Sequence, residues 1–233
     1  MTATSAHLEY VTRLGDNALV LGQRLAEWCG HGPVLEEDLA LTNIALDLIG
    51  QARLLLAHAG ALEGRGRSED DLAFQRDEPD FRNWTLMELP NGVGKHDDYA
   101  ITITRNFLAS ALHRLLWQAL SQSTDPDLAA IAARSVKEAG AHWRHASEWM
   151  VRLGDGTELS HQRMQDALDR LWPYTEEFWS PYPVEQAVAA SWIGVTTASL
   201  RAPWDAAIDD VLARATLARP RAGQFLATGK LGS

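Results

Sequence analysis

The sequence predicts an all-α protein with four long helices at its centre and additional helices near its carboxyl end. Apolar residues recur at spacings of three and four in several long segments, the period of a helix with one face against a core. One long polar, turn-rich segment, 61–97, separates the first two of these helices from the rest. No internal repeat and no break in composition divides the chain, so we expect a single domain over residues 1–233.

Composition narrows the class of protein. The 233 residues are 46% apolar, enough for a substantial core, and the net charge is −10 without a run of Lys or Arg. This balance disfavours nucleic acid and anionic membranes as partners. No segment has about 18 or more uninterrupted apolar residues, as a membrane span would, and no signal pattern opens the chain. Cys29 is the single cysteine, so no internal disulfide is expected and we expect a cytoplasmic protein. Nine tryptophans fit both a core and a large subunit interface.

The first two helices are predicted at about residues 5–29 and 36–60. Gly15 and Gly22 weaken the first helix by roughly 1 kcal/mol each relative to alanine, so we expect them to pack closely against a neighbour. Acidic residues begin the second helix, and Gly60 is expected to end it. Because the second helix is apolar almost all round, we expect it at the centre of the structure. The short connection between the two predicts an antiparallel pair.

The remaining elements follow from capping residues, prolines and apolar spacing. They are a short helix near Asn83 to Met87 within the crossover loop 61–97, a third helix at 98–122, a fourth from Asp125-Pro126 to Leu153, a fifth at about 160–179 kinked or ended by Pro173, an irregular segment at 180–203 that is hairpin-like around 192–195, and a last helix at about 204–218.

Long helices joined by one crossover suggest a ferritin-like four-helix bundle, in which a carboxylate-bridged di-metal centre is the site to test. Such a centre takes a Glu from each of two helices and a Glu-x-x-His from each of the other two, because positions i and i+3 place both ligands over one spot. Only Glu158 and His161 match that spacing. They lie just after the turn that ends the fourth helix, where helix capping explains them.

A polar cluster on the second and fourth helices is the strongest candidate site: Asp47, Gln51, Glu138 and His142. Asp47 and Gln51 share one row of the second helix, and Glu138 and His142 lie on the inward line of the fourth. Their spacing is Glu-x-x-x-His, and the positions three after Asp47 and Glu138 are Gly50 and Ala141. The cluster therefore lacks both histidines that a di-metal centre needs.

Gln23 and Glu27 on the first helix, with Thr104 or Asn106 on the third, are the remaining candidate donors. Even with them the ligand set is too small for two irons. We therefore expect no catalytic, cofactor-binding or metal-binding residue in this chain, and a buried hydrogen-bond network in which Asp47 or Glu138 pairs with His142.

Three alternatives stay open. The first is a di-metal oxygenase or oxidase active on its own through Asp47, Glu138 and His142. The second is a thiol–imidazole pair of Cys29 and His31, against the simpler interpretation of a packed cysteine. The chain has no dinucleotide-binding, phosphate-loop, serine-hydrolase or zinc-protease motif. A helical module that binds an unrelated protein is a third possibility.

Four stretches of the chain resemble the C subunits of bacterial phenylacetyl-CoA epoxidases, the PaaC family. They are LGDNALVLGQRLAEWCGHGPVLEEDLALTNIALDLIGQARLLLAHAG, ELPNG, VKEAGAHWRHASEWMVRLGDGTELSHQRMQDALDRLWPYTEE and WDAAIDDVLARATLARP. The likeness covers nearly the whole chain to about Pro220. Two departures are a longer NGVGKHDDYA segment and a final RAGQFLATGKLGS, from about residue 220 to 233, which we interpret as an irregular or appended tail.

The resemblance implies a ferritin-like fold and a role in aerobic phenylacetate degradation. In that family the di-iron centre and the binding site for phenylacetyl-CoA belong to the partner A subunit. A reductase subunit with flavin and an iron–sulfur cluster supplies electrons from NADPH. The C subunit is the non-catalytic structural mate of A, so the resemblance implies a heterodimer with A, further oligomerisation and no cofactor in this chain.

Overall fold

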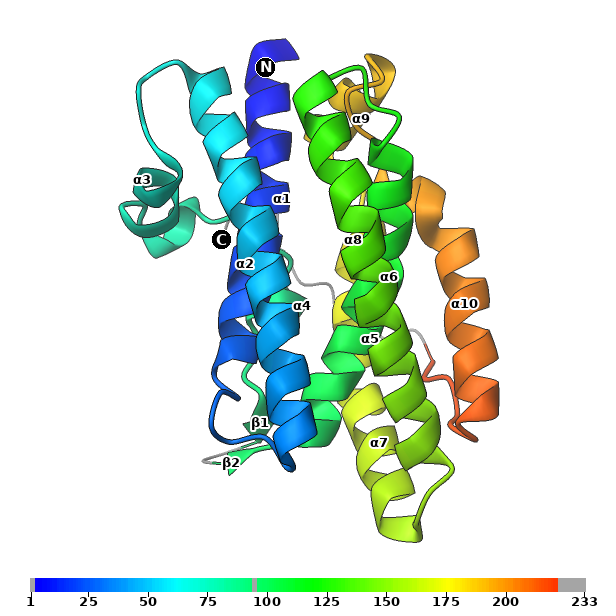
Figure 1. Cartoon of the computed structure of the whole chain (residues 1–233). Helices are drawn as coiled ribbons and strands as arrows, with labels where there is room; N and C mark the ends of the chain where they lie inside the picture. Colours follow the sequence, from blue (N-terminus) through cyan, green and yellow to red (C-terminus); the bar gives the residue numbers. More distant parts are fainter. Residues whose placement is uncertain (1–2, 94–95, 222–233) are drawn as a thin grey trace.

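A computed structural model describes residues 3–93 and 96–221, and these residues form the predicted all-α fold apart from one pair of two-residue strands (Figure 1). Its elements are α1 (Ala3–Ala26), α2 (Leu35–Glu63), α3 (Glu69–Phe74), η1 (Glu78–Asp80), α4 (Thr85–Glu88), β1 (Gly92–Val93), β2 (His96–Asp97), α5 (Tyr99–Leu120), α6 (Pro126–Gly154), α7 (Glu158–Leu171), η2 (Trp172–Thr175), α8 (Glu176–Trp179), α9 (Pro183–Ala190), η3 (Thr197–Leu200) and α10 (Arg201–Arg214).

The long helices α1, α2, α5 and α6 form a four-helix bundle of two antiparallel pairs, α1 with α2 and α5 with α6 (Figure 1). The predicted close packing of the first helix is confirmed. A Cβ atom added at Gly15 would lie 2.8 Å from Leu56 Cδ2, and one added at Gly22 would lie 3.1 Å from Ile49 Cγ1. These two glycines let α1 and α2 approach along their length, and the bundle agrees with the predicted ferritin-like class.

The central element is α5, and the expectation that the second helix occupies the centre is wrong. Helix α5 contacts α4, α6, α7, α10 and η3, and Ile103, Phe107 and Leu112 are fully buried. Helix α2 packs against α1 and α6, while several of its leucines face outward. Helix α2 is apolar almost all round, but one side packs in the bundle and the other side faces outward.

Helix α2 extends beyond Gly60 and ends at Gly64, so the expected end at Gly60 is also wrong. Gly64 adopts φ +69°, the left-handed conformation that suits glycine at a helix end. Gly60 lies inside the helix, where an added Cβ would be 2.3 Å from the carbonyl oxygen of Arg67. Gly60 is needed because the chain after α2 turns back and passes directly over this position.

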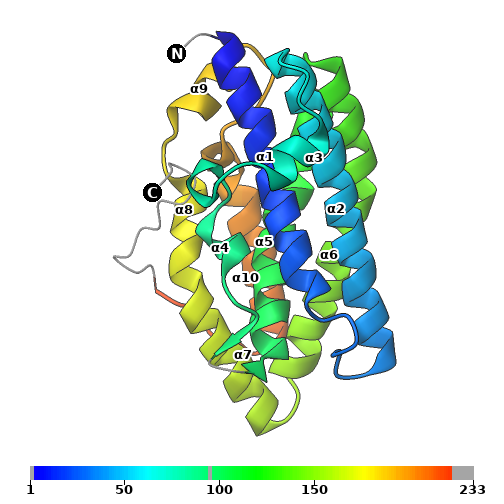
Figure 2. The same cartoon turned by 90° about the vertical axis from the view of Figure 1, so that its left-hand side faces the viewer.

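The crossover segment is more ordered than a loop with one short helix, because it contains α3, η1 and α4 and runs across α1 (Figure 2). Its anchor is Asp16 of α1, which is fully buried. The guanidinium of Arg76 donates to both carboxylate oxygens of Asp16, and the backbone N–H of Arg82 donates to Oδ2 at 3.0 Å. Asn17 accepts from the backbone N–H of Trp84 at 2.8 Å. These bonds fix the segment to the bundle.

In the carboxyl-terminal third, the prediction that Pro173 kinks or ends the fifth helix is confirmed. Helix α7 ends at Leu171, Pro173 falls within the 3-10 turn η2, and α8 follows it. Residues 180–203 contain α9 and η3 and no hairpin in this described part of the chain, and α10 begins at Arg201. Six of the nine tryptophans are buried, so most serve the core rather than an interface: Trp28, Trp84, Trp117, Trp172, Trp179 and Trp204. The predicted tail, from about residue 220 to 233, lies outside the described residues from 222 onward.

Candidate functional site

The four residues of the predicted polar cluster meet where α2 lies against α6. His142 Nε2 is 2.9 Å from Asp47 Oδ2, and the amide of Gln51 donates to Glu138 Oε2 at 2.8 Å. The Asp47 side chain is 41% exposed, whereas that of His142 is 7% exposed. The cluster therefore lies at the edge of the bundle and not along its central axis.

A third pair extends this line toward the start of α2. His145 Nε2 is 2.9 Å from Glu37 Oε2, which also accepts the hydroxyl of Tyr99. We name the three pairs the α2–α6 seam: Gln51–Glu138, Asp47–His142 and Glu37–His145. Sequence reasoning did not assign Glu37 or Tyr99, although His145 at three residues after His142 is the helical signal that extends the line.

The imidazole of His142 is held in its neutral form. Burial lowers the pKa of His142, and this effect outweighs the hydrogen bond to Asp47, which acts in the opposite direction. Neighbouring His113 on α5 is fully buried, and burial together with the nearby His142 lowers its pKa to about 4. The neutral His142 ring then donates its Nε2 proton to Asp47.

These residues do not fit a carboxylate-bridged di-metal centre. Gly50 meets open space where a side chain would project, and Ala141 is exposed, so the two positions that histidines would occupy face outward. Glu138 accepts from Gln51 and lies 3.5 Å from the guanidinium of Arg134. Within the described residues no three His, Cys, Asp or Glu side chains converge at the seam. The absence of metal here stays a prediction.

The other candidate donors lie elsewhere. Gln23 and Glu27 are exposed, and Glu27 pairs with Arg24 at 2.7 Å. Thr104 donates to the sulfur of Met150, and the buried amide of Asn106 has no hydrogen-bond partner in the described structure. None of the four joins the seam, so the interpretation that they could occupy its remaining ligand positions is wrong.

Cys29 is exposed, so the interpretation of a packed cysteine is wrong too. His31 Nδ1 lies 3.2 Å from the backbone oxygen of Cys29, and this contact does not involve the thiol. A hydrogen bond of this kind orients the turn between α1 and α2 and does not activate a nucleophile.

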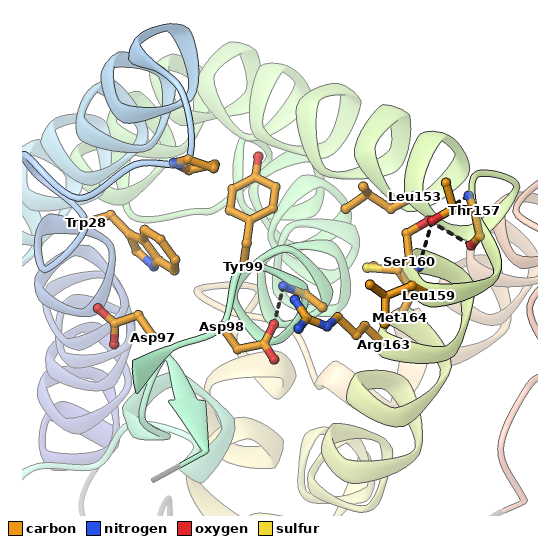
Figure 3. Close-up of a pocket in the computed structure, with 12 residues that line it drawn as sticks. Trp28, Asp97, Asp98, Tyr99, Leu153, Thr157, Leu159, Ser160, Arg163 and Met164 are labelled. Atoms are coloured by element: carbon orange, nitrogen blue, oxygen red, sulfur yellow. Dashed lines mark hydrogen bonds between the residues drawn. The ribbon is translucent and has the colours of Figure 1, made fainter. Parts of the chain in front are cut away.

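A pocket of about 540 Å³ opens among the ends of α1, α5, α6 and α7, with Trp28 and Tyr99 on one side and Arg163 and Met164 on the other (Figure 3). Three of the polar residues that line it serve helix caps. Asp98 accepts from the backbone N–H of Ala100 at 2.8 Å, and Thr157 and Ser160 form the capping box of α7. The pocket is therefore large enough for a ligand, but its described lining residues include no nucleophile in contact with a base.

The sequence is similar to known proteins along its whole length. A family model described as phenylacetic acid catabolic protein, PaaA_PaaC, matches residues 1–233. The chain belongs to this family. It is 47% identical over 223 residues to the C subunit of 1,2-phenylacetyl-CoA epoxidase from Escherichia coli (strain K12), a match that spans 96% of this chain and 88% of that protein. The resemblance predicted from the sequence is confirmed.

In this chain, the three pairs of the seam connect α2 to α6 by hydrogen bonds. They leave no free set of ligand atoms that a metal could bind. Each of the seam's three acids already faces an imidazole or an amide. A buried or half-buried carboxylate arranged in this way has its hydrogen-bonding capacity used between the two helices.

Proposed function

We propose that this chain is the C subunit of a 1,2-phenylacetyl-CoA epoxidase and serves there as the non-catalytic structural mate of a di-iron A subunit. The relative in Escherichia coli has that name and matches almost the whole chain. In the proposed cytoplasmic complex, phenylacetyl-CoA and iron bind to the A subunit, and a flavin and iron–sulfur reductase delivers electrons from NADPH. This chain contributes a surface and no ligand.

The observation that carries the proposal is the outward side of α2. We name five exposed side chains the apolar face of α2: Leu35, Leu39, Leu46, Ile49 and Leu54. Leu46 is 61% exposed and Leu35 is 72% exposed. A group of exposed large apolar side chains on one side of a helix marks a surface that is covered in the working assembly.

Gly50, on the outward side of α2, supports the same conclusion. A glycine inside a helix lowers stability by about 1 kcal/mol relative to alanine. Nothing in this chain requires it, because an added Cβ would meet no atom within 4 Å. A helix of the partner that approaches closely at this point would explain the glycine. Gly15 and Gly22 of α1 have that role, because they let α1 approach α2 closely.

A protein partner suits this face better than a lipid bilayer. Helix α2 is long and apolar enough to cross a membrane by length and composition, a test that core helices of soluble proteins also pass. However, its other side packs against α1, and Asn43, Asp47 and Arg53 interrupt the exposed side. A helix with these polar groups suits a subunit interface, where obligate contacts bury on the order of 2,000 Å² or more.

Co-purification with the A subunit tests the proposal. We expect Leu46→Lys to leave the free chain folded, because the side chain is exposed, and to weaken the A–C complex about a hundredfold or more, because a lysine would be buried without a partner. The matched control is Leu159→Lys on α7, where a leucine of similar exposure, 65%, lies away from the apolar face of α2.

Two results would contradict the proposal. Equal recovery of the A subunit with both variants would show that the apolar face of α2 is not the interface. Full epoxidation by the reductase and the A subunit in the absence of this chain would remove the structural role. Stoichiometric iron or manganese at the seam of the purified chain would instead favour the independent oxygenase.

A further inference from the structure

A second cluster of ionisable side chains lies at the opposite end of α2 from Glu37. It combines His7 near the start of α1, His58 near the end of α2 and Asp125, which immediately precedes α6. The side chains are 14%, 10% and 6% exposed, respectively. Sequence reasoning assigned Asp125 only as a helix cap, because the three residues are 51 to 118 positions apart along the chain.

Both imidazoles point at one atom. His7 Nε2 and His58 Nε2 each lie 2.6 Å from Oδ2 of Asp125. The other oxygen, Oδ1, accepts from the backbone N–H groups of Asp127 at 3.0 Å and Leu128 at 3.2 Å. The helix start therefore fixes the orientation of the carboxylate and leaves Oδ2 for the two histidines.

The far side of His58 faces a second acid. Its Nδ1 lies 3.8 Å from Oδ2 of Asp127, whose side chain is 78% exposed. Metal-binding histidines usually have a carboxylate, carbonyl or water at the ring nitrogen that does not bind the metal, which fixes the tautomer. Asp127 is placed for that role, so Nε2 of His58 is directed toward Asp125.

No permanent positive charge balances this buried acid. Within the described part of the chain, Asp125 has no Lys or Arg partner, and its side chain contacts are the two histidines and the helix start. By contrast, the buried Asp16 is paired with Arg76. A divalent cation would supply the charge that the protein does not.

We propose that His7, His58 and Asp125 form a structural binding site for a borderline divalent transition metal, of which zinc is the type. Two imidazole nitrogens and one carboxylate oxygen are three of the four ligands of a tetrahedral zinc site, and water completes it. Imidazole ligands disfavour magnesium and calcium, which prefer oxygen. The site joins the ends of α1 and α2 to the start of α6.

Metal entry requires a small rearrangement. The three ligand atoms all lie within 4.8 Å of one another. Zinc bonds to nitrogen and oxygen of about 2.0–2.2 Å place neighbouring ligands ~3.4 Å apart, so each imidazole moves back from Asp125 by less than about 1 Å. The partial exposure of both rings gives the ion a path from solvent.

Zinc and cobalt titrations of the full-length chain, after removal of metal with EDTA, test the site. We expect one Zn²⁺ per chain by calorimetry, and an intense visible absorption band when Co²⁺ replaces it. His58→Gln and Asp125→Asn are expected to weaken Zn²⁺ binding by at least about tenfold. Asp125→Asn retains the oxygen that caps α6, so it separates ligand loss from loss of the cap.

The control variant Cys29→Ser/His31→Gln removes an exposed thiol and imidazole outside the cluster and is expected to bind Zn²⁺ as the parent chain does. Zinc binding that disappears in this control, or that persists in both cluster variants, would overturn the proposal. The wild-type titration decides the question even if a variant fails to fold. Less than one bound Zn²⁺, or a Co²⁺ spectrum of the hexa-aqua ion alone, would leave a His–Asp–His hydrogen-bond network in place of a metal site.

Discussion

Glycines of α2 show how one residue type serves different purposes along a helix. Gly60 lies under the returning backbone of Arg67, whereas Gly50 faces open space. Gly64 ends the helix in a left-handed conformation. Only the surroundings of each position distinguish a glycine required by packing within the chain from one for which we propose a contact with a partner.

Substitution of these glycines is therefore expected to have opposite effects on the free energy of unfolding. Gly60→Ala should lower it by about 1–3 kcal/mol, because the backbone at Arg67 must shift. Gly50→Ala should raise it by about 0.5–1 kcal/mol in the free chain, because the added methyl group favours the helix without a clash. Urea denaturation of the two variants measures both. A loss of stability in both variants would contradict the assignment of Gly50.

The lowered pKa of His113 predicts that the free energy of unfolding depends on pH. Burial, with the nearby His142, lowers its pKa from 6.5 to about 4 in the folded chain. Below pH 6.5 the unfolded chain binds a proton that the folded chain does not, so the free energy of unfolding falls as the pH falls from 6.5 toward 4. At roughly 1.4 kcal/mol per pKa unit, the loss by about pH 5 is about 2 kcal/mol.

Urea denaturation at about pH 7 and about pH 5 checks this expectation, since most carboxylates remain ionised in that interval. His113→Gln should flatten the pH dependence, and His31→Gln, at an exposed position, should leave it unchanged. An unchanged slope in His113→Gln would show that His113 does not set the dependence.

At the scale of elements, a buried ion pair anchors the crossover segment to α1. Asp16 has no exposed surface and holds both Arg76 and the backbone of Arg82. The helices of this segment are short, since α3 has six residues and α4 has four, and further bonds to the bundle include that of the Trp84 N–H to Asn17. Local stability there is therefore governed by the anchor more than by helix propensity.

We expect Asp16→Ala to lower the free energy of unfolding by about 3 kcal/mol or more, because it leaves the guanidinium of Arg76 buried without its partner. Hydrogen exchange should increase first in residues 64–93. The matched control is Glu69→Gln, which removes a pair with the exposed Arg53 and is expected to leave exchange unchanged. Uniform destabilisation of the whole chain, with no preference for the crossover segment, would contradict the role of the anchor.

The sequence predicts most of the long helices because apolar spacing and capping residues are local signals. Asp125 and Pro126 mark the start of α6 correctly. The sequence did not predict α9 or the true end of α2, because Gly60 and the prolines after Trp179 have meanings set by distant contacts. The two sides of α2 were indistinguishable for the same reason, since Leu41 in the core and Leu46 on the surface are the same residue type.

At the scale of the whole molecule, one cluster of candidate residues could be predicted from the sequence and another could not. Asp47, Gln51, Glu138 and His142 were predicted together, because each pair shares a helix face. The joining of His7, His58 and Asp125 depends on how three helices meet at one end of the bundle, which no spacing in the sequence encodes. Together, the seam and the apolar face of α2 describe a chain whose acids stabilise helix packing and whose exposed leucines suit a protein partner.

Turnover of phenylacetyl-CoA by the assembled epoxidase tests most directly whether this chain is structural. In a complex rebuilt with Glu138→Gln/His142→Gln, we predict an unchanged kcat and an unchanged iron content per A–C pair, because the proposed structural role keeps both side chains away from the reacting atoms. A fall in kcat of about a hundredfold, the scale expected for loss of a general acid or base, with the complex still assembled, would contradict a structural role and place the seam in the chemistry.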